Sequence, residues 1–264
     1  MVLGHEGVGV VKAIGKSVKG MNICMTCCEC ERGEQLYCSQ RQLYGEMHLD
    51  QGSLASHAVW NEAFLFLVPD SFPSAEAAPL MCAGAAVYSA LNGARVRWSD
   101  RVGVLGVGGL GHLAIQFAAK MGCQVVALSH TRNKEADAIP GRISPEPVDC
   151  LLLTGAQQPD WGKIITLVRR GGVIVAMTVD PGSLRMPYMD LVMNAISIRG
   201  SLSAPPALHR EMLQFASFHK VKPLIETFTF MEQRINDAME KLRQGKMRYR
   251  GVIACEYKPE TTQV

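Results

Sequence analysis

Six residues in the middle of this chain, Gly106-Val-Gly-Gly-Leu-Gly111, constrain its fold more than any other segment. They follow an apolar run over 101–105, which predicts a buried strand, and they precede an apolar stripe that predicts a helix over 110–121. Gly122 predicts the end of that helix, and the run over 124–128 is typical of a second strand. Strand, glycine turn, helix and strand in this order predict a βαβ unit in a parallel sheet.

The glycines of this turn have the spacing that a dinucleotide-binding site needs. A diphosphate binds backbone N–H groups at a helix N-terminus, where the helix dipole is positive. Glycine permits the sharp turn and leaves no Cβ in the path of the ligand. The alternative is a tight turn that binds nothing, but the flanking elements favour binding. The predicted contacts are Gly106, Gly108, Gly109, Leu110 and Gly111.

The end of the second strand bears on the choice of cofactor. NAD-binding sites usually place Asp or Glu there, whereas this chain has Ser129-His-Thr131-Arg132-Asn-Lys134. No carboxylate would repel a 2′-phosphate, while Ser129 and Thr131 offer hydrogen bonds and Arg132 and Lys134 offer positive charge. We therefore predict NADP(H) rather than NAD(H). The alternative is that the two cations only begin a solvated helix.

Composition excludes several other classes of protein. The chain has 264 residues, 48% hydrophobic and 19% charged, which predicts a folded globular protein. A net charge of +3 without a dense basic run gives no support for a nucleic-acid partner. The longest apolar stretch, 102–121, is interrupted by glycines and polar residues, so no membrane span is predicted. No secretory signal is recognised, and we expect a cytoplasmic protein.

Four of the nine cysteines form a tight group, Cys24-x2-Cys27-x2-Cys30-x7-Cys38. Four thiolates at this spacing fit one tetrahedral Zn²⁺ with every coordination position closed, which is typical of a structural site. Such a site replaces apolar core that a small lobe cannot supply. The alternative is a group of free thiols. Cys28 lies within the group as a surplus residue, either a bystander or a competing ligand.

Four motifs in order give the chain a family resemblance. They are Gly4-His5-Glu6-Gly7-x-Gly9, the four-cysteine lobe, Ala78-Pro-Leu-Met-Cys82-Ala-Gly84, and the glycine turn followed by His112. The chain resembles the zinc-dependent medium-chain alcohol dehydrogenases, and most of all their cinnamyl-alcohol-dehydrogenase-like, NADP-dependent branch. The resemblance extends from Gly4 to about Arg250.

The resemblance implies an α/β fold in which a Rossmann-type parallel sheet domain is inserted in a partial GroES-like β-rich catalytic domain. We expect a catalytic part with irregular β structure over 1–85 (zinc lobe 22–40), an NADP-binding domain over 86–218 and a return to the catalytic domain over 219–264. The resemblance also implies interconversion of primary alcohols and aldehydes by hydride transfer, and a homodimer.

The resemblance further implies a catalytic zinc and a set of cofactor contacts. His5 and Cys82 match two of the family's zinc ligands, and Glu6 matches the acid beside the histidine. His5 lies close to the first residue of the sequence, so we expect the site to lack the family's first zinc cysteine. Residues after the later predicted strands are expected at the cofactor: Thr154, Thr178, Val179, Ser201, Leu202, Ser203 and Arg250.

Three functions remain open at this point. The first is an NADP-dependent zinc alcohol dehydrogenase or aldehyde reductase. The second is a truncated family member that binds cofactor but has lost or changed the redox chemistry, and so serves as a scaffold or a non-redox catalyst. The third is a zinc-independent reductase, which the cysteine lobe and the His5–Cys82 pair argue against.

Overall fold

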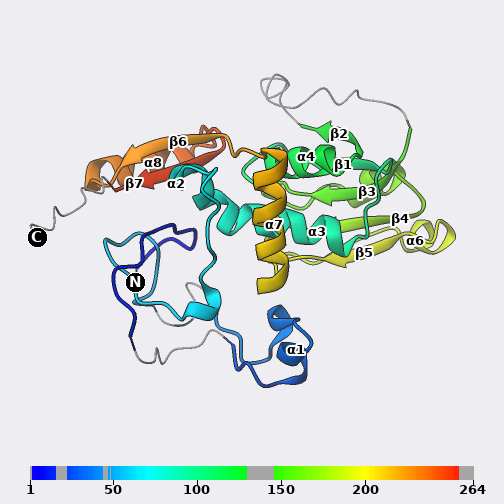
Figure 1. Ribbon diagram of the computed structural model, residues 1–264. Coiled ribbons are helices and arrows are strands. Elements are labelled where there is room, and N and C mark those ends of the chain that lie inside the picture. Colours follow the sequence, from blue (N-terminus) through cyan, green and yellow to red (C-terminus); the bar gives the residue numbers. More distant parts are fainter. Residues whose placement is uncertain (1, 16–22, 44–46, 48, 130–145, 256–264) are drawn as a thin grey trace, which may run out of the picture.

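A five-stranded parallel sheet forms the centre of the computed structural model, which describes residues 2–15, 23–43, 47, 49–129 and 146–255 (Figure 1). Its strand order is β2-β1-β3-β4-β5, and every neighbouring pair is parallel. This confirms the predicted α/β sheet. The strands are β1 (Arg101–Leu105), β2 (Gln124–Leu128), β3 (Val148–Leu153), β4 (Val168–Ala176) and β5 (Ser197–Gly200).

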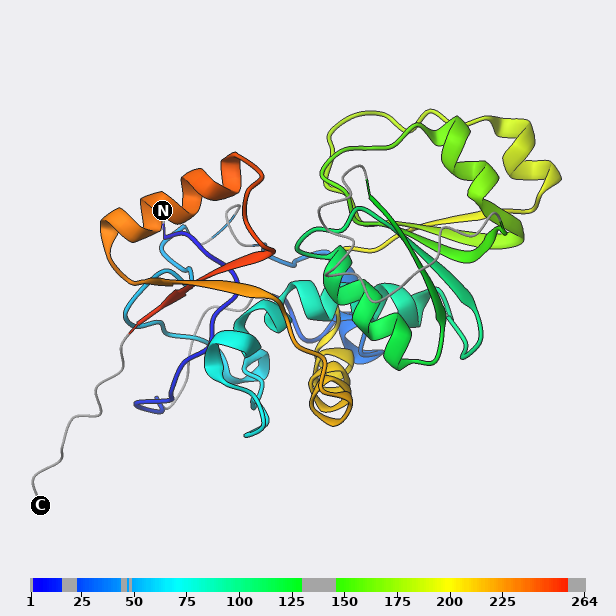
Figure 2. The same ribbon diagram turned by 90° about the horizontal axis from the view of Figure 1, so that it is seen from above.

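Helices cover both faces of this sheet because alternate side chains of each strand point to opposite faces. In β3, Cys150 and Leu152 belong to one buried cluster, and Leu151 and Leu153 to the other. Figure 2 shows α3, α4 and α7 on one side of the sheet and α5 and α6 on the other. These helices are α3 (Ala83–Gly93), α4 (Gly111–Lys120), α5 (Trp161–Ile164), α6 (Tyr188–Met193) and α7 (Pro206–His219), with a 3₁₀ turn η5 (Ile165–Leu167) after α5.

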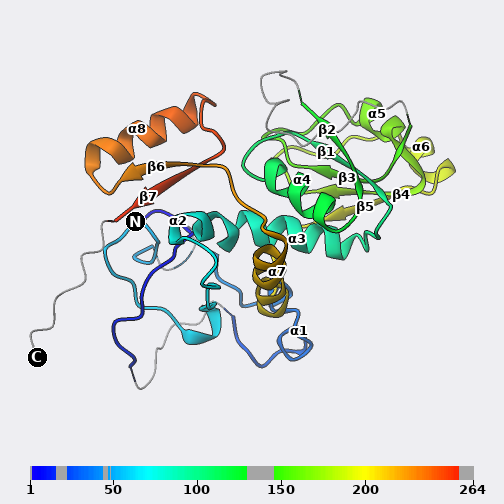
Figure 3. The same cartoon turned by 45° about the horizontal axis from the view of Figure 1, so that its top comes forward.

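A smaller parallel sheet pairs β6 (Ile225–Thr229) with β7 (Arg250–Ala254), and α8 (Glu232–Arg243) connects them. Figure 3 shows this unit beside the first part of α3, to one side of the five-stranded sheet. The runs over 224–230 and 250–257 predicted both strands, and the 3.6-residue periodicity predicted the helix between them. The chain therefore passes from the large sheet through α7 to this smaller unit, in which Arg250 is the first residue of β7.

The part of the chain before Arg101 differs from the expectation. Its described residues form short helices and extended segments, and none of them lies in a β-strand. A strand needs a neighbour that satisfies its backbone groups, but in the described structure Val10 and Val11 are more than two-thirds exposed. The short elements are α1 (Cys28–Glu31), η1 (Gln35–Tyr37), η2 (Glu62–Phe64), α2 (Ser74–Ala77) and η3 (Ala78–Met81).

The domain limits at 85 and 218 stay a prediction. Within the described ranges, every helix is too short or too polar to cross a bilayer.

His209 on α7 connects the helical layer to the N-terminal part of the chain. Its ring is 6% exposed and stacks on Phe66 with the ring centroids 4.0 Å apart. Its Nε2 atom is buried without a hydrogen-bond partner. Burial lowers the pKa of His209 from 6.5 to about 4, with the nearby Arg210 charge as a second cause.

This pKa predicts a loss of stability in acid. The unfolded chain takes up a proton near pH 6.5 and the folded ring only near pH 4. Protonation therefore adds no cost to folding above pH 7, and the free energy of unfolding falls as the pH drops from 6.5 to about 4. We expect His209→Phe to keep the stack on Phe66 and to be more stable than wild type at pH 4, by on the order of 2 kcal/mol. Urea unfolding at a series of pH values measures this. A gap that does not change with pH would contradict the assignment.

Candidate active site

The glycine turn follows β1 directly and begins α4. Gly106 has a φ of +102°, which favours glycine, and a Cβ at Gly111 would lie 1.9 Å from the Gly106 carbonyl oxygen. A Cβ at Gly108 would meet nothing within 4 Å. The turn is therefore closely packed at its ends and open in its middle, as a ligand that approaches backbone N–H groups requires.

Thr154, after β3, holds this turn from the neighbouring strand. Its hydroxyl donates to the carbonyl oxygens of Leu105 (3.1 Å) and Gly106 (2.7 Å), and its own N–H donates to Leu105. The side chain is buried and its hydroxyl is occupied by these bonds. Thr154 thus shapes the turn, and whether it also contacts a cofactor stays a prediction.

Among the described residues, the predicted cofactor contacts that follow β2, β4 and β5 lie at the same edge of the sheet, because these strands are parallel and end there. Thr178 follows β4 and its hydroxyl donates to the Leu153 carbonyl at 3.4 Å. Val179 is 86% exposed, and Leu202 is also exposed. Ser129 follows β2 and is exposed, whereas Thr131, Arg132 and Lys134 lie outside the described residues. Ser201 and Ser203 follow β5, and the Ser201 N–H donates to the Ala176 carbonyl.

A second cluster brings together His5, Glu6 and Cys82, which are distant in sequence. The His5 Nε2 and Cys82 Sγ atoms are 3.2 Å apart, and one ligand atom from each of the three residues lies within 4.8 Å of the others. Cys82 is the N-cap residue of α3, and the Ala83 N–H donates to Glu6 at 3.3 Å. The helix N-terminus therefore stabilises the Glu6 carboxylate.

The backbone around Gly52 fixes the position of His5. The Ser53 N–H donates to the Gly4 carbonyl (2.9 Å), and the Leu54 N–H donates to the Leu3 carbonyl (2.8 Å). A Cβ at Gly52 would lie 2.5 Å from the Val2 carbonyl oxygen. Only a glycine permits this approach, so the segment over 49–54 holds the residues just before His5 in one path.

Arg250, the first residue of β7, connects this cluster to the glycine turn. Its Nη2 donates to Glu6 Oε1, and the pair is largely buried, with 25% and 19% of the two side chains exposed. A Cβ at Gly109 would lie 3.0 Å from both Cδ and Nη1 of Arg250. One guanidinium therefore touches the acid of the cluster and packs against the glycine turn.

Burial dominates the electrostatics of the cluster. It raises the pKa of Glu6, against the opposing charges of Arg250 and His5. It also raises the pKa of the Cys82 thiol to about 11, and the Glu6 charge adds to this shift. A divalent cation among the three residues would reverse both shifts because it stabilises the carboxylate and the thiolate. Imidazole, thiolate and carboxylate together are a donor set that suits zinc.

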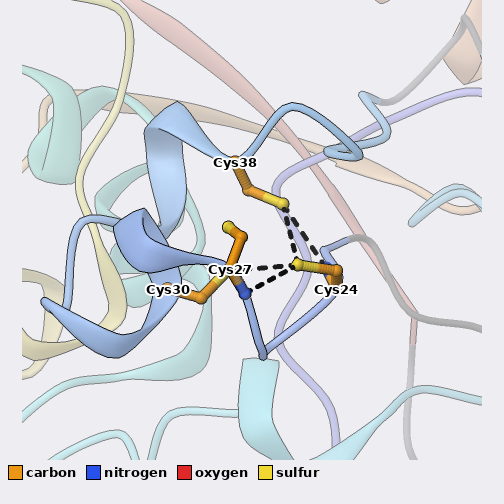
Figure 4. A group of neighbouring side chains, drawn as sticks. All are labelled: Cys24, Cys27, Cys30 and Cys38. Carbon is orange, nitrogen blue, oxygen red and sulfur yellow. Dashed lines mark hydrogen bonds between the residues drawn. The ribbon is translucent and has the colours of Figure 1, made fainter.

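The four-cysteine lobe has the geometry that a tetrahedral zinc site requires. Cys24 Sγ lies 3.6 Å from Cys38 Sγ and 3.9 Å from Cys30 Sγ (Figure 4). Zn–S bonds of 2.3 Å in a tetrahedron place the sulfurs about 3.8 Å apart. The Cys27 N–H donates to Cys24 Sγ, and the backbone bond from Thr26 is the largest of the causes that lower the pKa of Cys24 to about 6. These four residues fit a structural zinc ion.

Burial in the lobe leads to the same conclusion. Its buried cluster contains Ile23, Cys30 and Cys38, with Phe64 and the other two ligand cysteines packed against it. All nine cysteines are free of disulfides. A cluster this small buries little apolar surface, so we infer that the fold of the lobe depends on the metal.

Two polar residues of α4, to which the sequence analysis gave no role, connect this helix to the segment over 222–224. His112 bonds to the Gly108 carbonyl and to the Leu224 N–H, and its ring stacks on Tyr249. Gln116, one helical turn later, bonds to the Lys222 backbone. One signal was available: His112 and Gln116 are polar residues four apart in an otherwise apolar helix, so they share a face and need buried partners.

Comparison with known proteins finds relatives among the alcohol dehydrogenases. Residues 1–70 match the profile of the alcohol dehydrogenase GroES-like domain. The chain is 30% identical to an alcohol dehydrogenase from Moraxella sp. (strain TAE123), over 95% of this chain and 81% of that protein. It is also 30% identical to the NADP-dependent alcohol dehydrogenase C 1 of Mycolicibacterium smegmatis, over 96% and 81%. The chain belongs to the medium-chain zinc alcohol dehydrogenase family.

Solved structures support this membership. The crystal structure of CAD from Helicobacter pylori complexed with NADP(H) superposes with a TM-score of 0.86 at 26% identity, covering 96% of this chain and 81% of that one. The chain thus combines a Rossmann-like sheet with an N-terminal GroES-like region, and it is an oxidoreductase of an NAD(P)-dependent family.

Removal of one lobe cysteine tests the structural zinc. We expect Cys24→Ser to lose about one zinc ion per chain and to lower the melting temperature, because three thiolates no longer close the tetrahedron. Cys28→Ser is the matched control, since Cys28 is exposed and stands outside the four-sulfur group. Metal analysis by mass spectrometry measures both variants. Equal zinc content in Cys24→Ser and Cys28→Ser would refute the site.

Proposed function

We propose that this chain interconverts primary alcohols and aldehydes by hydride transfer with NADP(H), with a zinc ion at His5, Glu6 and Cys82. The contact of Arg250 with both Glu6 and the Gly109 region of the turn carries the proposal. A coenzyme bound at the turn by its pyrophosphate would lie next to the metal-ligating cluster. Hydride transfer would require the coenzyme and the substrate to lie this close together.

The residues of the chain have separable parts in this chemistry. When bound, zinc supplies Lewis acidity toward the substrate oxygen, and the nicotinamide supplies or accepts the hydride. His5 and Cys82 offer a nitrogen and a sulfur donor 3.2 Å apart, and Glu6 offers an oxygen within the same 4.8 Å group. Three protein donors are usual for a catalytic zinc. Arg250 and the Ala83 N–H at the α3 N-terminus oppose the effect of burial, which raises the pKa of Glu6.

The preference for NADP(H) is supported by the end of β2. The Leu128 carbonyl accepts the Gly106 N–H at 2.8 Å, so Ser129 follows beside the start of the turn. A hydroxyl at this position can donate a hydrogen bond to a 2′-phosphate, whereas a carboxylate would repel the phosphate. The relative from Mycolicibacterium smegmatis is named as NADP-dependent, and the Helicobacter pylori structure contains NADP(H).

Loss of the metal ligands tests the reaction. We expect the wild-type chain to oxidise NADPH with a panel of aliphatic and aromatic aldehydes, and His5→Ala and Cys82→Ala to lose at least about 100-fold in kcat. The affinity for NADPH should stay within about twofold, because the proposed pyrophosphate contacts belong to the glycine turn and not to these two residues. Cys123→Ala, at the opposite end of β2, is the matched control and should keep its activity.

Two outcomes oppose this reaction. Unchanged turnover in His5→Ala and Cys82→Ala would exclude metal catalysis at this cluster. Saturable NADPH binding without turnover in the wild type would favour a coenzyme-binding chain that lacks redox chemistry.

A charge at Ser129 tests the coenzyme preference. We expect wild type to bind NADPH more tightly than NADH, and Ser129→Asp to weaken NADPH binding by at least about tenfold through repulsion of the 2′-phosphate. NADH binding should be unchanged or stronger, because the new carboxylate can accept the ribose hydroxyls. Ser129→Asn has nearly the same size without the charge and is the control. Tighter NADH binding by the wild type would defeat the proposed preference.

A further inference from the structure

The His112 side chain is buried and both of its ring nitrogens are engaged. It is 2% exposed, its Nδ1 lies 2.9 Å from the Gly108 carbonyl oxygen, and the Leu224 N–H donates to its Nε2 at 3.2 Å. Because Nε2 accepts a hydrogen bond, the ring proton is on Nδ1, which donates to Gly108. The imidazole is therefore neutral, in one tautomer, with no bonding capacity left over.

The ring bond to Gly108 and a backbone bond together fix where the next amide points: the Gly108 carbonyl accepts the His112 N–H at 3.1 Å as well as the Nδ1 proton. In a planar trans peptide the carbonyl of one residue and the N–H of the next point in opposite directions. With the Gly108 carbonyl directed at the His112 ring, the Gly109 N–H is directed away from it. A Cβ at Gly108 would meet no protein atom within 4 Å, so the turn has open space at this residue for an anion.

The other side of the ring is connected to Arg250. The Leu224 carbonyl accepts the N–H groups of Tyr249 (3.1 Å) and Arg250 (3.3 Å). The Tyr249 ring stacks on His112 at 4.9 Å and 11°. One nitrogen of the imidazole thus contacts the turn. Through Leu224 and Tyr249, the same ring is also connected to the segment that places the Arg250 guanidinium beside Gly109.

We infer that His112 is a positioning residue for the coenzyme: it aims the Gly109 N–H and the Arg250 side chain at the same pyrophosphate. This inference rests on the proposed binding of a nicotinamide coenzyme at the glycine turn. A purely structural role, as a bond between α4 and the segment over 222–224, is the competing explanation. The two differ in which ligands they affect.

Gln116 provides a control within the same helix. Its Nε2 donates to the Lys222 carbonyl (2.8 Å), and the Lys222 N–H donates to its Oε1 (3.0 Å). Gln116 therefore holds the same segment with two hydrogen bonds. No hydrogen bond is recorded between its side chain and the glycine turn within the described structure. Gln116→Ala removes the structural bond alone, whereas His112→Ala removes the structural bond and the clamp on Gly108.

The test compares two ligands in three proteins by calorimetry. NADPH contains the pyrophosphate, while 2′-AMP carries the adenosine and its 2′-phosphate without it. We expect His112→Ala to weaken NADPH binding by about tenfold, the size of one lost charge-assisted contact, and to bind 2′-AMP within about twofold of wild type. Gln116→Ala should bind both ligands as wild type does, although its melting temperature falls.

Each outcome decides between the explanations. Equal weakening of NADPH and 2′-AMP in His112→Ala, or equal NADPH weakening in Gln116→Ala, would overturn the positioning role. If His112→Ala does not fold, His112→Phe keeps the stack on Tyr249 without the two hydrogen bonds and should show the same selective loss. Wild type that binds 2′-AMP but neither NADPH nor NADH would instead refute the proposed function, and the inference with it.

Discussion

The ion pair between Arg250 and Glu6 joins two residues that are 244 positions apart, and the site depends on it. Its cation comes from the first residue of β7 and its anion from the segment next to α3. A largely buried pair of this kind is costly to break, because removal of one partner leaves the other charge without compensation. The pair thereby binds the smaller sheet to the N-terminal part of the chain, and its Arg250 side chain also packs against the glycine turn.

This arrangement makes the two halves of the candidate chemistry mutually dependent. The turn determines where a coenzyme phosphate can lie, and the Arg250 guanidinium is the cation nearest to Gly109 that the structure describes. The same guanidinium opposes the effect of burial on the Glu6 carboxylate. A bound anion at the turn would share Arg250 with Glu6 and so change the charge next to the proposed metal ligands. The His112 contacts hold these groups in one geometry. Glu6 and a bound anion would therefore compete for Arg250 without a change in side-chain conformation.

The sequence predicted the elements whose signals are local. The runs over 101–105, 124–128 and 148–153 match β1, β2 and β3 residue for residue, because short apolar strands between turns carry their own boundaries. The irregular β structure expected over 1–85 was wrong for the described residues, since a strand there depends on partners that local pattern does not reveal. The contacts of His112 and Arg250 were also out of reach, because they depend on how β6 and β7 return to the turn.

The two candidate metal sites show the same difference between local and long-range signals. The four cysteines of the lobe lie within fifteen residues, so their spacing alone predicts a tetrahedral metal site, and the sulfur distances agree with it. His5 and Cys82 are 77 residues apart, and no spacing rule connects them. They meet because Gly52 lets one segment fix the path before His5 and because α3 begins at Cys82. The first site can form before the chain has folded around it, whereas the second exists only once α3 has packed on the sheet. Loss of α3 packing should therefore abolish the second site and leave the first intact.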